Sequence, residues 1–160
     1  MSIPAPIVSS VASVDPAWID YNGHMNMAYY SLLFDHAVDE AYAVLGFGPE
    51  YIASRQHTTY TAEFHVCYVR ELHLGDRVRC RFQLLDHDEK RIHSYQEMWH
   101  EDGWLAATAE SLSLHIDMSG PRVAPFPADV MSRLQAIQQA HAALPRPERA
   151  GRGIGIVRRG

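Results

Sequence analysis

The sequence has few cysteines and no long apolar run. Its two cysteines, Cys67 and Cys80, do not form a Cys-x-x-Cys pair, and each falls within a predicted strand, so we interpret both as reduced packing residues. No stretch approaches the roughly eighteen apolar residues that a membrane span requires. The first residues also lack the charged start and apolar run of a secretory signal. These absences favour a cytoplasmic protein with no membrane partner.

The signatures of several functional classes are also missing. No Gly-x-Ser-x-Gly elbow occurs, which argues against an α/β-hydrolase. The ten histidines are scattered without a pair at the spacing of metal ligands, so we predict no metal site. The body of the chain is acidic, and its aromatic residues fall on core-facing positions. We therefore expect no nucleic-acid partner.

What is present fits one globular domain. The chain of 160 residues is long enough to bury roughly 70% of the surface that its unfolded form exposes, and 47% of its residues are hydrophobic. The formal net charge is −5, yet residues 146–160 contain five Arg and one Glu among several glycines. We predict a single domain over 1–145 and a flexible basic tail over 146–160. The alternative for this tail is a segment that holds an anion such as a nucleotide phosphate.

A long helix is predicted to end near Leu45. Gly46, Gly48 and Pro49 supply the stop signals that follow a helix end. Apolar side chains recur at the spacing of one face of a 3.6-residue helix, namely Tyr30, Leu33, Phe34, Ala37, Val38, Ala41, Val44 and Leu45. This apolar stripe requires another element to cover it.

The rest of the chain predicts an antiparallel sheet. A first strand is expected within 6–14, and a last helix over about 128–143. Alternating apolar and polar residues, with a hairpin signal at Asp102-Gly103, predict four more strands at 59–68, 77–84, 91–100 and 104–117. We therefore predict an α+β fold in which a sheet of about five strands wraps around the long helix, with a short C-terminal helix.

One of these strands is predicted to bury an apolar face against the helix and to supply much of the stability. That face comprises Tyr60, Ala62, Phe64, Val66 and Tyr68. The alternate residues, among them Glu63 and His65, form the polar face of the same strand.

A loop of polar and turn-forming residues leads into the long helix, with the pattern Asp20-x-Asn22-Gly23-His24-x-Asn26. This pattern, together with the element order over residues 6–118, resembles the hotdog fold and, within it, the 4-hydroxybenzoyl-CoA thioesterase-like family. The longer string Asp-Tyr-Asn-Gly-His-Met-Asn-Met-Ala-Tyr-Tyr, with Tyr-Thr-Ala-Glu-Phe-His downstream, more narrowly resembles the thioesterases of carnitine and betaine metabolism. The related class with a catalytic Glu in mid-helix has no clear counterpart here, since Asp35 and Asp39 lie a turn or more beyond the motif.

The resemblance implies an acyl-CoA thioesterase in which Asp20 attacks the thioester or activates water. It also implies that a backbone N–H at the helix start, that of Met27 or a neighbour, holds the oxyanion. Both roles fit elementary chemistry, because a carboxylate can act as nucleophile or base and the first amides of a helix lack intrahelical partners. The alternative for Asp20 is a simple turn residue before the helix.

The neighbouring loop residues are candidates for substrate contact, each with a structural alternative. Asn26 is well placed as a helix N-cap, and Asn22-Gly23 as a tight turn that permits close approach of the substrate. His24 either hydrogen-bonds the loop or the acyl group, or has a purely structural role.

Further candidates lie on the strands. The resemblance implies a homodimer or dimer of dimers with a site between subunits, where Glu63 and His65 approach the partner's Asp20 loop. The alternative for Glu63 is a solvated or paired acid at the interface. Glu63 with Tyr60 is a candidate for holding a trimethylammonium acyl group. Arg79, Arg91 and Arg122 are candidates for the phosphates of coenzyme A, with a solvated basic stripe as the alternative.

No cofactor is expected, since coenzyme A is part of the substrate. Two rival functions use the same fold. One is a hotdog acyl-CoA hydratase or dehydratase, and the other is a non-catalytic acyl-CoA-binding module.

Overall fold

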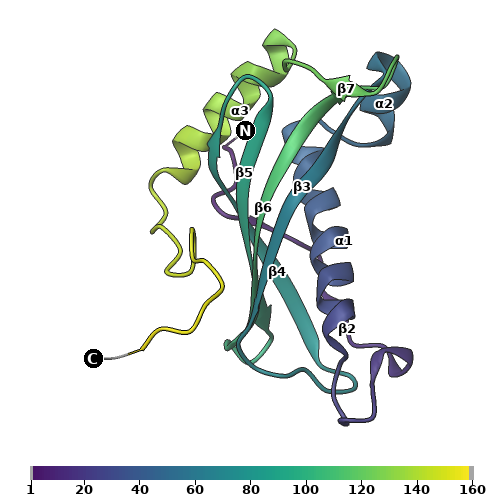
Figure 1. Cartoon of the computed structure of the whole chain (residues 1–160), viewed down its shortest axis with the longest axis vertical. Helices are drawn as coiled ribbons and strands as arrows, with labels where there is room; N and C mark the ends of the chain where they lie inside the picture. The colour runs from purple at the N-terminus through teal and green to yellow at the C-terminus, as the bar shows by residue number, and fades with distance from the viewer. Residues whose placement is uncertain (1, 159–160) are drawn as a thin grey trace.

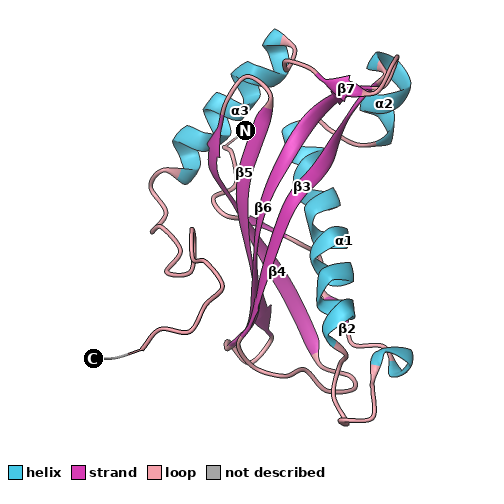
Figure 2. Cartoon of the chain, in the orientation of Figure 1, coloured by secondary structure: helices cyan, strands magenta, loops and turns pink. Residues whose placement is uncertain are grey.

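A long helix lies along one face of an antiparallel sheet in the computed structural model, which describes residues 2–158 (Figures 1 and 2). The helix is α1 (Met27–Leu45), and the sheet has seven strands. Its main path runs β1-β4-β5-β6-β3, with β2 beside β4 and β7 beside β6. The strands are β1 (Ile7–Val8), β2 (Ala12–Ser13), β3 (His57–Tyr68), β4 (Arg77–His87), β5 (Arg91–His100), β6 (Leu105–Asp117) and β7 (Arg122–Val123). The predicted α+β architecture is confirmed.

The apolar stripe of α1 faces the sheet, as its spacing predicts. The helix begins after Asn26 and ends at Gly46, whose φ of 90° places it in the left-handed region that favours glycine. Six side chains of the stripe are buried: Tyr30, Leu33, Phe34, Ala37, Ala41 and Leu45. Burial of side chains of this kind typically contributes about 1.5–3 kcal/mol each, so the stripe fixes the helix firmly on the sheet.

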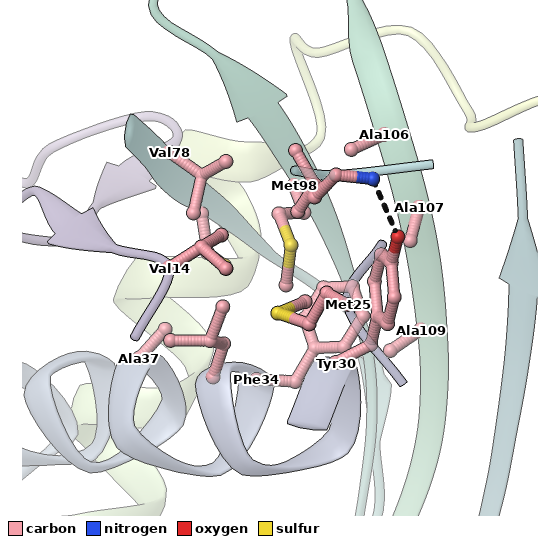
Figure 3. Packing of buried hydrophobic residues seen from close by; sticks show 13 residues of the cluster. Val14, Met25, Tyr30, Phe34, Ala37, Val78, Met98, Ala106, Ala107 and Ala109 are labelled. Carbon is pink, nitrogen blue, oxygen red and sulfur yellow. Dashed lines mark hydrogen bonds between the residues drawn. The ribbon is translucent and has the colours of Figure 1, made fainter. Parts of the chain in front are cut away.

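The core lies in two clusters along α1. The cluster at its N-terminal half includes Met25, Tyr30, Phe34 and Met98 (Figure 3). The hydroxyl of Tyr30 accepts a hydrogen bond from the Leu72 N–H at 2.9 Å, drawn as a dashed line in Figure 3. A second cluster surrounds the C-terminal half, where α3 (Ala128–His141) packs against β4 and α1. Because Met25 belongs to the first cluster, this cluster anchors the loop of residues 20–26 in the core.

The predicted alternation of β3 is wrong at its start. The register shifts between Thr61 and Glu63, so that Tyr60 lies opposite Leu114 while Phe64 lies opposite Ser111. Tyr60 thus lies on the face of the sheet opposite α1, which we name the outer face, together with Glu63.

The apolar face of β3, which was predicted to be buried against α1, is only partly buried within one chain. Phe64 and Tyr68 face α1 but remain 41% and 46% exposed. These rings remain exposed because β3 is the last strand of the sheet, so that one of its edges has no neighbouring strand.

Three elements differ from the sequence-based expectation. The expected first strand is divided into β1 and β2, which both pair with β4. A seven-residue helix, α2 (Pro49–Arg55), begins at Pro49, which was read only as a stop signal. A bidentate ion pair from Arg55 to Asp129 of α3, with N···O distances of 2.8 and 2.7 Å, joins the two helices. The short strand β7 was also not expected.

The chain after α3 returns along the outer face of the sheet (Figure 1). The Gly151 N–H donates to both carboxylate oxygens of Glu110 at 2.9 and 2.8 Å. The side-chain amide of Gln83 reaches the Pro145 carbonyl at 3.4 Å. Within residues 2–158, no helix is long and apolar enough to cross a lipid bilayer.

His141 is buried in α3 and makes two hydrogen bonds that fix its tautomer. Its Nδ1 accepts from the Leu84 N–H at 2.9 Å, and its Nε2 lies 3.0 Å from the Pro4 carbonyl, to which it donates. A proton on Nδ1 would face an N–H donor. Burial lowers the pKa of His141 below its ordinary value.

His115 in β6 is a second buried histidine. Its Nδ1 donates to the Ala124 carbonyl at 2.8 Å, and its Nε2 lies 2.8 Å from the Tyr51 hydroxyl. Burial is the main cause that lowers the pKa of His115. Both histidines are therefore neutral in the folded protein under conditions where the unfolded chain takes up protons.

We predict that the free energy of unfolding falls as the pH drops below about 6.5, because the unfolded histidines then bind protons that the folded ones do not. Each histidine contributes a loss of up to about 1.4 kcal/mol between pH 7.5 and 5.5. Urea unfolding at both pH values measures this loss. The His141→Gln variant keeps an acceptor and a donor without titrating, so its loss is expected to be smaller. Equal losses in the two proteins would contradict this role of His141.

Candidate active site

The loop of residues 20–26 is a closed turn held at several points. The Gly23 N–H donates to the Asp20 carbonyl at 3.0 Å, and Gly23 has a φ of 82°, a conformation that side chains disfavour. The Asp20 N–H donates to the His24 carbonyl at 3.2 Å. The Met25 N–H donates to the Leu72 carbonyl at 2.7 Å, which ties the turn to the segment after β3. The predicted tight turn at Asn22-Gly23 is present.

The carboxylate of Asp20 accepts one hydrogen bond on each oxygen. Its Oδ1 accepts from the Asn22 N–H at 2.8 Å, and its Oδ2 accepts from Asn26 Nδ2 at 3.0 Å. The bond from the Asn22 backbone is the main cause that lowers the pKa of Asp20 below its ordinary value of 3.8, with contributions from Asn26 and from the nearby His24. Asp20 is therefore ionised at neutral pH, as a nucleophile or a general base must be.

Asn26 joins this carboxylate to the start of α1. Its Oδ1 accepts from the Ala28 N–H at 3.0 Å, which makes Asn26 the N-cap of the helix. Met27 is the first helical residue, and no acceptor within residues 2–158 lies at hydrogen-bonding distance from its N–H. An ionised carboxylate and an unpaired amide at the positive end of the helix dipole are thus connected through one side chain.

A cavity of about 280 Å³ lies beside this helix start. The Tyr68 hydroxyl closes one side by donating to the Met27 carbonyl at 3.1 Å, and its ring meets the Tyr30 ring edge-on at 5.1 Å between centroids. Figure 3 shows Met25 beside the Tyr30 ring in the core cluster. The lining residues are His24, Met25, Met27, Tyr30, Tyr68, Val69, Arg70 and Glu71.

His24 belongs to this cavity, as its place in the motif suggested. Its Nδ1 lies 3.4 Å from the Met25 carbonyl, and its ring is 6.3 Å from the His73 ring. Asn22 takes part through its backbone N–H, and Gly23 through its turn conformation. The loop residues predicted from the sequence therefore come together.

The predicted residues of β3 do not join them within one chain. Tyr60, Glu63 and His65 lie on the outer face. Tyr60 donates its hydroxyl hydrogen to Met118 Sδ at 3.2 Å, and His65 Nε2 lies 3.8 Å from Cys67 Sγ. Since strands rise about 3.3 Å per residue, Glu63 lies about 17 Å along β3 from Tyr68.

The three predicted coenzyme A arginines are also dispersed. Arg91 lies 2.5 Å from Asp88, and Arg122 lies 2.9 Å from Asp117. Both lie at the far end of the sheet, Arg91 about 23 Å and Arg122 about 33 Å along the strands from Tyr68. Arg79 lies on β4 nearer the loop, on the outer face, without an ion pair inside the described chain.

Sequence reasoning missed Tyr30, Tyr68 and Glu71 as cavity residues. Both tyrosines have the apolar spacing of core positions, and only their hydroxyl bonds distinguish them. Glu71 follows β3 in a segment with no motif. Within the described chain, no group of three or more His, Cys, Asp or Glu side chains is arranged to hold a metal ion.

A second cavity of about 480 Å³ lies further along α1. It includes Asp35 and Tyr42 from the helix and Phe64 from β3. The buried Oε1 of Gln96, also in its wall, has no hydrogen-bond partner in the described residues. This cavity opens beside the free edge of the sheet.

Comparison with known proteins identifies the family. A family model described as the thioesterase-like superfamily matches residues 14–134. Betainyl-CoA thioesterase of Pseudomonas aeruginosa is 40% identical over 142 residues, which are 88% of this chain and 89% of that protein. An L-carnitine dehydrogenase/betainyl-CoA thioesterase of Rhizobium meliloti is 40% identical over 147 residues, which are 91% of this chain but 29% of that longer protein.

Solved structures agree with this assignment. A hypothetical protein of Staphylococcus aureus, solved in complex with CoA, has a TM-score of 0.87 and 26% identity and covers 98% of this chain and 100% of its own. A putative thioesterase of Pseudomonas putida has a TM-score of 0.82 and 28% identity, with the same coverage. The resemblance and fold predicted from the loop motif are confirmed. The chain therefore belongs to the thioesterase-like superfamily, as a thioesterase with the hotdog fold.

Proposed function

We propose that this protein hydrolyses betainyl-CoA to betaine and free coenzyme A, with Asp20 and the Met27 N–H as its catalytic groups. The observation that carries this proposal is the double contact of Asn26, which holds the Asp20 carboxylate and caps the helix whose first amide is unpaired. The choice of acyl group rests on the 40% identity to betainyl-CoA thioesterase over nearly the whole of both chains.

The chemistry needs two functions at one point. The thioester oxygen accepts a hydrogen bond from the Met27 N–H, which stabilises the negative charge that forms when the carbonyl carbon is attacked. Asp20 either attacks that carbon itself or removes a proton from the water that attacks. In the first route Asp20 adds to the carbonyl carbon, the carbon–sulfur bond breaks and the coenzyme A thiolate leaves, and water then hydrolyses the resulting mixed anhydride between Asp20 and the acyl group. In the second route the carbon–sulfur bond breaks after water has added, and both routes give the same acid and thiol.

The loop supports either route by keeping the carboxylate ionised and directed. Asn22 and Asn26 each donate to one oxygen of Asp20, which leaves the remaining lone pairs for substrate or water. His24 lies in the adjoining cavity wall and supplies positive charge beside Asp20 when protonated. We propose Asn22, Gly23, His24 and Asn26 as residues that position the site.

We also propose that β3 pairs with β3 of a second copy. This strand has twelve residues and a free edge, and its α1-facing side leaves Phe64 and Tyr68 about half exposed. Antiparallel pairing of two such edges buries these rings and covers the second cavity. Arg79, which has no ion pair within residues 2–158, is the best placed of the three arginines to meet the coenzyme A phosphates.

The isosteric Asp20→Asn substitution is expected to lower kcat for betainyl-CoA by about 10²–10⁴-fold, because the neutral amide neither attacks the thioester nor accepts a proton. Thiol release with a colorimetric reagent measures this, and circular dichroism checks that the fold is kept. Undiminished thiol release by the variant would refute the role of Asp20. Tight binding of acyl-CoA by the wild type without any thiol release would instead favour the binding-module or hydratase function.

Removal of the Met27 N–H is a direct test of the oxyanion site. Met27→Pro removes this donor with the side chain and should leave the helix in place, since proline is well suited to the first position of a helix and Asn26 already has the extended backbone that precedes proline. We expect a loss of about 10²–10³-fold in kcat with little change in the melting temperature. Met27→Ala, which keeps the amide, serves as the control and should lose far less. Equal activities of the two variants would contradict the assignment.

The Phe64→Glu variant is expected to weaken the dimer by at least about tenfold in dissociation constant, because it places a charge in the proposed interface. Val123→Glu alters an equally exposed residue of β7 and should leave the dimer intact. Sedimentation over a range of concentrations measures both variants. A wild-type protein that is monomeric at micromolar concentration would rule out this interface.

A further inference from the structure

We propose that Glu71, with the rings of Tyr30 and Tyr68, recognises the quaternary ammonium of the acyl group in the cavity beside Met27. This inference rests on the proposed function and assigns its substrate specificity to residues outside the loop motif. It moves the expected cation site from Tyr60 and Glu63, on the outer face, to the segment that follows β3.

The short distance between the cation and the thioester carbon in the substrate favours this cavity. In a betainyl thioester, one methylene group separates the nitrogen from the carbonyl carbon, and two bonds of about 1.5 Å place the two atoms about 2.5 Å apart. The carbonyl oxygen is taken by the Met27 N–H, so the cation must lie within a few ångströms of the helix start. The cavity lined by Met27, Tyr30 and Tyr68 is at that position.

The walls of this cavity suit a cation that has no N–H donors. A trimethylammonium group gains from ring faces and negative charge instead of from directed hydrogen bonds. The Tyr68 ring is held beside the helix start by the bond of its hydroxyl to the Met27 carbonyl at 3.1 Å. The Tyr30 hydroxyl is held by the Leu72 N–H at 2.9 Å, next to Glu71 in the chain.

Glu71 supplies a negative charge that nothing else in the described chain neutralises. It lines the cavity and takes part in no ion pair or hydrogen bond of its side chain within residues 2–158. Burial is the main cause that raises the pKa of Tyr30, which also lines the cavity, and the charge of Glu71 is a smaller cause in the same direction.

The positive groups of the same wall do not occupy this position. The Arg70 guanidinium lies over the Trp104 ring, 4.1 Å from its centroid, and is thereby held against β6 and the turn before it. The His24 ring is held at its own loop, with its Nδ1 3.4 Å from the Met25 carbonyl. Glu71 is then the group that sets the sign of the charge at the mouth of the cavity.

Two other candidate carboxylates, Asp35 and Glu63, lie further from the helix start. Asp35 of the second cavity is eight residues along α1 from Met27, about 12 Å at 1.5 Å per residue. Glu63 lies on the outer face and about 17 Å along β3 from Tyr68. Neither approaches a cation so close to the thioester carbon within one chain.

The test compares two substrates of the same shape. Betainyl-CoA carries a positively charged nitrogen where 3,3-dimethylbutanoyl-CoA carries a neutral carbon, and the two are otherwise the same. The ratio of their kcat/KM values therefore measures recognition of the charge. We expect the full-length wild type to prefer betainyl-CoA and Glu71→Gln to lower this ratio about tenfold, the size of one cation contact. Asp35→Asn is the matched control, a carboxylate of the neighbouring cavity, and should keep the wild-type ratio.

The outcomes separate this inference from the proposed function. A wild type that prefers betainyl-CoA, with an unchanged ratio in a folded Glu71→Gln variant, overturns the role of Glu71 and leaves the proposed function standing. A ratio that collapses in Glu63→Gln or Asp35→Asn instead places the cation elsewhere and also overturns it. A wild type that releases no thiol from betainyl-CoA overturns the proposed function and this inference together.

Discussion

The two-sided contact of Asn26 is the interaction on which the site depends. One end of its amide donates to Asp20, and the other accepts from the first turn of α1. A side chain with only an acceptor would cap the helix but would leave Oδ2 of Asp20 without its hydrogen bond, and one with only a donor would do the reverse. The asparagine amide therefore couples the direction of the Asp20 carboxylate to the direction of the helix.

This coupling is useful only because the helix itself does not move on the sheet. The side chains of Leu33 and Phe34 are almost completely buried about two turns after Asn26. The loop is also held by Leu72, whose carbonyl accepts a hydrogen bond from the Met25 N–H and whose N–H donates to the Tyr30 hydroxyl. Burial of apolar area thus supplies the rigidity, while a few hydrogen bonds supply the direction, and a preorganised amide needs both to stabilise charge in a transition state.

The sequence was sufficient for features that are local or strictly periodic. The spacing from Tyr30 to Leu45 identified α1, and Asn26 before it identified the N-cap that the structure contains. It was insufficient at β3, where the shift after Thr61 reverses the face of Tyr60, because a bulge adds one residue without any change in composition. It also missed α2, since Pro49 both follows one helix and begins another.

The candidate active site likewise has a part that is local in the sequence and a part that only the fold brings together. The proposed catalytic groups, Asp20 and the Met27 N–H, lie within eight residues of each other, so a short motif can record them. The wall that is proposed to meet the acyl group comes from the end of β3, more than forty residues later, and reaches Met27 only through the folded sheet. Under this proposal, substitutions at Tyr68 or Glu71 would alter the acyl group that is accepted without disturbing the Asn26 contact. The short motif Asp20–Asn26 then indicates thioester hydrolysis, while the acyl group is indicated by residues beyond it.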